Sequence, residues 1–267
     1  MTGHTPSAWK RAAMRSDRRF WLPAMAILLA GCASARVSGW EAFLPPYRLG
    51  PLMTQVNAMG IRSLELTLVA GLFAGMVVAL QGAHELARFG ATLYIGPAVA
   101  RSIAREAGPL MVALLVGGKV AAGITAELGA MRVTEQVEAL RAIGGNYLKL
   151  LVTSRLLAAV LVFPILTVIA DVVGVIGGLL VAVFQFSLDS RLYWNTIAEL
   201  VTVQDYLGGI AKAAVFGFLV ALIGCYRGLA FTGGAAELGH ATTGAVVGIG
   251  IAVLTANYLM TQLIFLL

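Results

Sequence analysis

Arg101, Arg105 and Glu106 are charged residues that stand inside a long apolar stretch of this 267-residue chain. Arg101 and Arg105 are four residues apart, so they share one face of a helix. Charged side chains at membrane depth are costly and usually face a cavity or a partner. Two interpretations remain open: a polar lining that meets a lipid headgroup or couples to gating, or a structural arrangement in which Arg105 pairs with an acidic residue on a neighbouring helix.

Three further charged residues, Lys119, Asp171 and Lys212, interrupt apolar stretches. Asp171 lies among valines and glycines, where a carboxyl group could relay protons. A neutral or hydrogen-bonded structural aspartate is the interpretation that we favour. We expect the two lysines to lie near the ends of apolar segments or to pair internally.

The sequence contains no complete catalytic motif among those that we considered. The segment from His84 begins like HExxH but has Arg88 in place of the second histidine. Gly118-Lys119 is followed by Val120, where a Walker A motif needs Ser or Thr. No nucleophile–base pair is visible at a common depth, which disfavours an intramembrane hydrolase. We therefore expect neither an enzyme nor a metal or cofactor site, and any ATP and magnesium would be bound by another chain.

The composition requires the bilayer as solvent for most of the chain. Hydrophobic residues make up 59% and charged residues 12%, against about 25% charged in soluble domains. The apolar stretches approach or exceed the roughly 20 residues that a membrane-crossing helix needs. They cover residues 66–83, 93–126, 150–184, 207–226 and 244–267. We predict an all-α integral membrane protein with five transmembrane helices, in which Gly71 and Gly75 allow close helix approach.

Residues 1–61 are predicted to form a basic segment ahead of the transmembrane domain, residues 62–267. An apolar stripe at helical spacing indicates an N-terminal interfacial or elbow helix. The stripe consists of Leu49, Leu52, Met53, Val56 and Met59. Residues 14–32, with arginines before an apolar run and Cys32 at its end, also resemble a bacterial lipoprotein signal. We favour a half-inserted or interfacial helix there.

The placement of charge predicts the orientation of the chain. Basic residues gather before the first span and after the second and fourth spans, while the loops on the other side hold only Arg88 and Arg191. Because positively charged segments stay inside, we expect a multi-pass membrane protein with a cytoplasmic N-terminus. The same placement gives nucleic-acid binding little support.

The connections between spans differ in character. Residues 127–145 follow a helical period, with Val133, Val137 and Leu140 on one side, which predicts a polar helix that docks on a soluble partner. Residues 84–92 and 227–243 are predicted to be a short polar loop and a glycine-rich loop. Residues 185–206 are predicted to be an exposed connection in which Tyr193 and Trp194 anchor the membrane interface.

Several motifs from residue 40 onward resemble the MlaE/YrbE permease family. The matching segments are Pro45-Pro46-Tyr47-Arg48, Gly75-Met-Val-Val-Ala-Leu-Gln81-Gly82, Arg105-Glu106-x-Gly108-Pro109, Gly123-Ile-Thr-Ala-Glu127-Leu-Gly129-x-Met131-Arg132-Val-Thr134-Glu135-Gln136, and Ala241-Thr242-Thr243. The sequence departs from the family pattern at Ala107 and Lys119, where leucine and arginine are usual, and at Asn146-Tyr147, where Asp-Pro is common.

The resemblance implies the permease subunit of an ABC transporter that moves phospholipid or a related lipid between the inner membrane and an MCE-domain protein on the outer side. It also implies a second copy of the chain, a separate ATPase and, in some systems, a STAS-domain protein. The polar helix at about 127–145 would be the coupling helix. Its expected ATPase-docking residues are Glu127, Arg132, Glu135, Gln136, Glu138 and Arg141. The expected lipid-pathway residues are Gly75, Leu80, Gln81, Arg101, Arg105 and Glu106.

An ion- or proton-coupled secondary transporter is the alternative function. Asp171 and the Arg105/Glu106 pair would then carry the coupling. That class is typically built from inverted repeats, and none is visible in this sequence.

Overall fold

The computed structural model describes residues 49–142, 149–230 and 233–266, and all regular structure in these ranges is helical. The predicted lipoprotein-like or half-inserted segment at residues 14–32 lies outside the described residues. The long helices are α3 (Ile61–Arg88), α6 (Gly117–Val133), α8 (Ser154–Phe186), α10 (Val203–Ala230) and α11 (Ala235–Leu266). The shorter ones are α2 (Leu49–Met59), α4 (Ile95–Ser102), α5 (Gly108–Met111), α7 (Gln136–Ala142) and α9 (Ser190–Leu200). A 3-10 turn (Thr92–Tyr94) and three π-helical turns, Ile103–Ala107, Val112–Val116 and Lys149–Thr153, complete the set.

Five segments of the described chain are long and apolar enough to cross a membrane, which confirms the predicted all-α fold with five spans. They are Gly50–Arg88, Thr92–Val133, Leu151–Phe186, Val203–Ala230 and Glu237–Ile264. The helices run further than the apolar residues alone, because polar flanks continue them. The predicted loops at 84–92 and 227–243 are consequently shorter than expected: α3 ends at Arg88, α10 ends at Ala230 and α11 begins at Ala235.

The first and third spans pack along a stripe of small residues on α3. The stripe repeats every fourth residue and comprises Ser63, Thr67, Gly71, Gly75, Ala79 and Ala83, all buried. A Cβ on Gly75 would lie 1.9 Å from the carbonyl oxygen of Gly174, and one on Gly71 would lie 2.9 Å from that of Ala170. Side chains at this seam would separate α3 from α8, so these glycines serve close helix packing.

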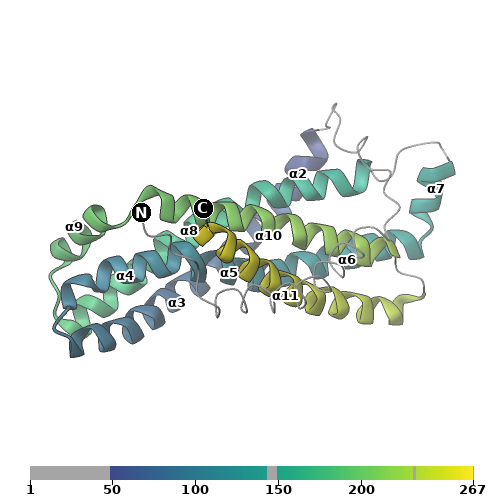
Figure 1. Cartoon of the computed structure of the whole chain (residues 1–267). Coiled ribbons are helices and arrows are strands. Elements are labelled where there is room, and N and C mark those ends of the chain that lie inside the picture. The colour runs from purple at the N-terminus through teal and green to yellow at the C-terminus, as the bar shows by residue number, and fades with distance from the viewer. Residues whose placement is uncertain (1–48, 143–148, 231–232, 267) are drawn as a thin grey trace, which may run out of the picture. The chain divides into compact units, whose positions relative to one another are not determined.

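The fourth span lies alongside the second in the same way. A Cβ on Gly209 would lie 1.9 Å from the carbonyl oxygen of Ala104, and one on Gly224 would lie 3.3 Å from the Cα of Ala121. Later residues of the fourth span thus contact later residues of the second span, so the two spans run parallel. Helix α11 packs against α6 and α10, as Figure 1 shows.

Helices α7 and α9 lie at opposite ends of this bundle (Figure 1). We call the two ends the α7 end and the α9 end. At the α7 end, α6 and α10 finish and α8 begins; at the α9 end, α8 finishes and α10 begins. Helix α2 forms where the apolar stripe predicts it: Leu52 and Val56 pack against the core, Met59 is buried and Met53 is exposed.

The prediction that Tyr193 is an exposed interface anchor is wrong. Residues 190–200 form helix α9, with the Asp189 side chain accepting a hydrogen bond from the N–H of Arg191 at its start. Tyr193 is fully buried, and its hydroxyl donates to the carbonyl oxygen of Val175 at 3.1 Å. Burial raises the pKa of Tyr193, so the hydroxyl stays protonated and able to donate. The exposed Trp194 remains a predicted anchor.

The polar helix expected over residues 127–145 is divided in the structure. Residues 127–133 continue the membrane helix α6, and α7 is a separate short helix that starts at Gln136. Glu135 between them has φ +58°, a left-handed conformation that turns the chain. Its N–H donates to the carbonyl oxygen of Arg132 at 3.1 Å. Val137 is buried against the core, so packing of an apolar side chain holds α7 in its new direction.

Candidate functional site

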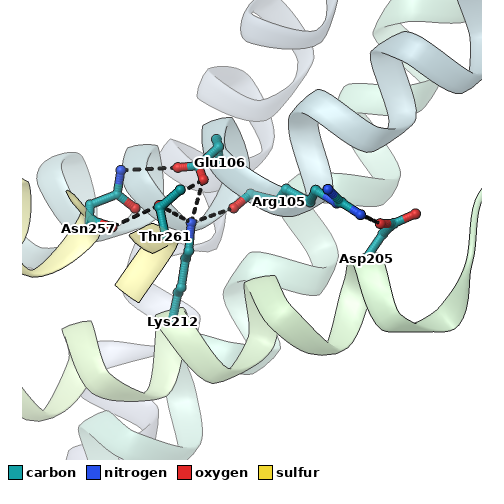
Figure 2. A network of polar contacts seen from close by, with 6 residues as sticks. All are labelled: Arg105, Glu106, Asp205, Lys212, Asn257 and Thr261. Carbon is teal, nitrogen blue, oxygen red and sulfur yellow. Dashed lines mark hydrogen bonds and ion pairs between the residues drawn. The ribbon is translucent and has the colours of Figure 1, made fainter. Parts of the chain in front are cut away.

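A polar network lies inside the bundle, toward the α9 end. Its members come from the second, fourth and fifth spans and are Arg101, Arg105, Glu106, Asp205, Lys212, Asn257 and Thr261. Figure 2 shows six of them, with Arg105 and Glu106 directed to opposite sides of their helix. The contacts between spans join residues about 50–150 positions apart in sequence, so only the packing of the spans brings the three groups together.

A π-helical turn carries Arg105 and Glu106. The N–H of Gly108 donates to the carbonyl oxygen of Ile103, five residues earlier, and Pro109 has no N–H to offer. The carbonyl oxygen of Arg105 therefore lacks its usual α-helical donor. The ammonium group of Lys212 donates to it at 3.1 Å. Single π-helical turns inside α-helices frequently occur at functional sites.

On one side of this turn, two arginines share a single carboxylate. Arg105 Nε donates to Asp205 Oδ1 at 2.5 Å, and Arg101 Nε donates to Asp205 Oδ2 at 3.3 Å. Asp205 Oδ2 also accepts from the Thr202 N–H at 3.1 Å and from its hydroxyl at 2.9 Å. Arg101 additionally donates to the carbonyl oxygen of Leu200. The second span is thereby fixed to the beginning of α10.

On the other side, the ammonium group of Lys212 is fully hydrogen-bonded. It donates to the carbonyl oxygen of Arg105, to Glu106 Oε1 at 2.5 Å and to Thr261 Oγ1 at 2.7 Å. An ammonium group has three protons, so these three acceptors use all of them. The Lys212 side chain is only 2% exposed. The expectation that Lys212 pairs internally is therefore confirmed.

Glu106 joins this lysine to the last span. Besides Lys212, its oxygens approach the Thr261 hydroxyl at 2.9 Å and the Asn257 amide nitrogen at 3.0 Å. The Thr261 hydroxyl also lies 2.8 Å from the carbonyl oxygen of Asn257. It has one proton and donates to one of these two acceptors at a time. The Glu106 side chain is 42% exposed, so the spans enclose it only in part.

The charges of the network do not cancel. Glu106 and Lys212 balance each other, whereas Arg101 and Arg105 face the single carboxylate of Asp205. The two arginine side chains are 46% and 45% exposed, while that of Asp205 is fully buried. One positive charge is therefore left over on a partly exposed surface, which suits an anionic group such as a phosphate.

The other expected pathway residues lie in different surroundings. Gly75 is buried in the seam with α8, and Leu80 and Gln81 are exposed on α3. Asp171 on α8 is buried beside Gly108, and its Oδ1 has no hydrogen-bond partner among the described residues.

Sequence reasoning missed Asp205, Asn257 and Thr261. Asp205 stands at the edge of an apolar stretch, where an acidic residue usually reads as a solvated helix start. Asn257 and Thr261 are uncharged, so they do not interrupt the hydropathy pattern of the last span. The i, i+4 spacing of Asn257 and Thr261 on one helix face is the one signal that could have connected them.

The expected docking residues divide into two groups. Glu135, Gln136 and Glu138 are exposed at or on α7, around the buried Val137. Arg141 lies on α7, but its side chain is outside the described residues.

Glu127 and Arg132 instead belong to α6, the membrane helix. Glu127 pairs with Arg155 of α8 at 2.9 Å, and Arg132 donates to the carbonyl oxygen of Leu229 on α10. Both side chains thus bond to neighbouring spans at the α7 end.

Comparison with known proteins identifies the family. The family model described as Permease MlaE matches residues 52–263. A probable ABC transporter permease protein of Rickettsia typhi is 40% identical over 221 residues, which cover 83% of this chain and 85% of the relative. The intermembrane phospholipid transport system permease protein MlaE of Haemophilus influenzae is 34% identical over 215 residues, or 80% and 82% of the two chains. The chain therefore belongs to the MlaE family of ABC transporter permeases, which carry no catalytic site of their own and imply an ATPase partner.

Proposed function

We propose that this chain moves phospholipid or a related lipid between the inner membrane and an MCE-domain protein on the outer side, driven by a separate ATPase. The observation that carries the proposal is α7. Val137 fixes this short helix to the core, while Glu135, Gln136 and Glu138 remain exposed at the end of the bundle. A helix anchored by a buried apolar side chain and polar on its outer face suits docking into a groove of a soluble protein and transmitting its movement.

Lipid as cargo has independent support. The relative from Haemophilus influenzae is named for intermembrane phospholipid transport. The surplus positive charge at Arg101 and Arg105 suits a lipid phosphate, and guanidinium groups bind phosphate with paired hydrogen bonds. We accordingly assign Arg101, Arg105 and Glu106 to the charged part of the lipid pathway, and the exposed Leu80 and Gln81 of α3 to the approach to it.

The charge distribution supports a cytoplasmic α7 end. Helices α6 and α10 finish there with Arg132 and Arg227, and α8 begins there with Arg155, whereas Arg88 and Arg191 lie toward the α9 end. The positive-inside rule thus supports a topology in which α7 lies on the ATPase side and α9 on the MCE side. A second copy of the chain, and in some systems a STAS-domain protein, would complete the complex.

Docking through α7 is tested by exchanging its charges. We expect Glu135→Arg with Arg141→Glu to abolish co-purification of the ATPase from native membranes while the chain remains inserted. Glu199→Arg on α9, at the opposite end, should leave co-purification intact. Retention of the ATPase by the α7 variant would contradict the docking role.

Cargo and energy source are tested with purified complex in phospholipid vesicles. We expect transfer of labelled phospholipid that requires ATP and the ATPase subunit. Transport by the chain alone, driven by an ion gradient, would instead support a secondary transporter.

A further inference from the structure

Arg155 is a buried arginine at the α7 end, in the first turn of α8. Its side chain is 4% exposed. Its Nη2 lies 2.9 Å from Glu127 Oε2, and its Nη1 donates to the carbonyl oxygen of Leu151 at 2.5 Å. Arginine stays charged in proteins, so the carboxylate of Glu127 compensates a positive charge that water reaches poorly.

The two members of this pair lie on either side of α7 in the sequence. Glu127 lies six residues before the end of α6, and Arg155 is the second residue of α8. The pair, which we call the clasp, therefore joins the two spans that flank the proposed coupling helix.

The same part of α6 is also bonded to α10. The Thr125 hydroxyl donates to the carbonyl oxygen of Gly224 at 3.1 Å, and Arg132 donates to that of Leu229. These contacts and the clasp connect the last turns of α6 to α8 and α10. Separating α6 from α8 would leave the guanidinium of Arg155 buried without its counter-charge, which is strongly unfavourable.

We propose that the clasp transmits the displacement of α7 to α8, so that the spans on both sides of the coupling helix move together. Glu127, whose side chain is 53% exposed, is then a positioning residue that acts through Arg155. The inference rests on the proposed ATPase-driven function. Without the clasp, α7 could still bind the ATPase and follow its movement, but α8 would receive that movement less completely.

The test compares ATP hydrolysis with phospholipid transfer in the full reconstituted complex. The variants are Glu127→Gln, Arg155→Lys and the double variant Glu127→Gln/Arg155→Gln. Lysine keeps the charge of Arg155, but its single ammonium group cannot reproduce the guanidinium fork. Coupling free energies between sites typically correspond to 5–150-fold effects. We expect all three variants to assemble with the ATPase, to hydrolyse ATP within about twofold of the unmodified complex, and to transfer lipid about tenfold more slowly.

The double variant separates coupling from simple charge balance, because it removes the link without leaving a buried charge unpaired. Recovery of normal lipid transfer in the double variant would overturn the proposal, as would a parallel loss of hydrolysis and transfer. Glu85→Gln is the matched control: it breaks a 3.6 Å pair with Arg88 whose side chains are 67% and 71% exposed, and exposed pairs contribute little. Absence of ATP-dependent transfer in the unmodified complex would instead refute the proposed function itself.

Discussion

Removing Glu106 should destabilise the protein more than removing its partner, Lys212. The two sides of this ion pair have different access to solvent: the Lys212 side chain is 2% exposed and that of Glu106 is 42% exposed. Glu106→Gln leaves a buried ammonium group with only neutral acceptors. Lys212→Met leaves a carboxylate that meets solvent and still accepts from Asn257 and Thr261. It also removes the lysine donor of the Arg105 carbonyl oxygen.

The magnitudes follow from this asymmetry. Leaving an uncompensated buried charge costs about 3–5 kcal/mol in soluble proteins. We take the lower end, about 3 kcal/mol, for Glu106→Gln, because polar groups also find partners in the unfolded state within a membrane. Losing these lysine hydrogen bonds should cost about 1–2 kcal/mol in total, which is less than the sum of bonds worth about 1.5–3 kcal/mol each, because solvent and the remaining donors compensate the partly exposed carboxylate.

The assay is the midpoint of thermal unfolding in detergent for both single variants, the double variant and Glu85→Gln as control. One kcal/mol shifts Tm by about 2–4 °C in a chain of this size. We therefore expect Tm to fall by about 6–12 °C for Glu106→Gln and by about 2–8 °C for Lys212→Met. The double variant should resemble Lys212→Met, since no unpaired ammonium group remains. Equal effects of the two single variants, or a double variant less stable than Glu106→Gln, would refute the reasoning.

Two further predictions concern the packing of the bundle. Gly75→Leu should prevent stable folding, because even a Cβ would lie 1.9 Å from a carbonyl oxygen of α8. Size-exclusion chromatography in detergent should then show loss of the monodisperse peak. Gly82→Leu, at a position with open space, should keep that peak. Tyr193→Phe removes the hydrogen bond from the tyrosine hydroxyl to the carbonyl oxygen of Val175. This loss should cost about 1 kcal/mol and lower Tm by about 2–4 °C. An unchanged Tm would show that the bond contributes nothing to stability.

Much of the fold could be predicted from local sequence. Hydropathy along the chain located all five spans, because a membrane helix must satisfy its own backbone and expose apolar side chains. The stripe from Leu52 to Met59 indicated α2, and the GxxxG pair at Gly71 and Gly75 indicated close packing. These features depend on neighbours within one helix, so a single sequence contains them.

Other features were predicted incorrectly because their environment comes from distant residues. Tyrosine is typical of membrane-interface anchors, yet Gly96 and Gly178 leave the space in which the ring and hydroxyl of Tyr193 are buried. The polar segment from residue 127 has a helical period, yet the left-handed Glu135 divides it. Periodicity reports which residues share a face but not where the chain turns.

The sequence by itself determined that charged residues lie within membrane helices, because the order of residues shows which charges fall inside an apolar stretch. Only the tertiary structure decided their partners. Glu106 meets Lys212 from another span, and Glu127 meets Arg155 across two helices although its neighbours in sequence suggested a docking surface. Buried charges must be compensated, but which residue compensates each depends on helix register and direction, and these are set by packing of the whole bundle.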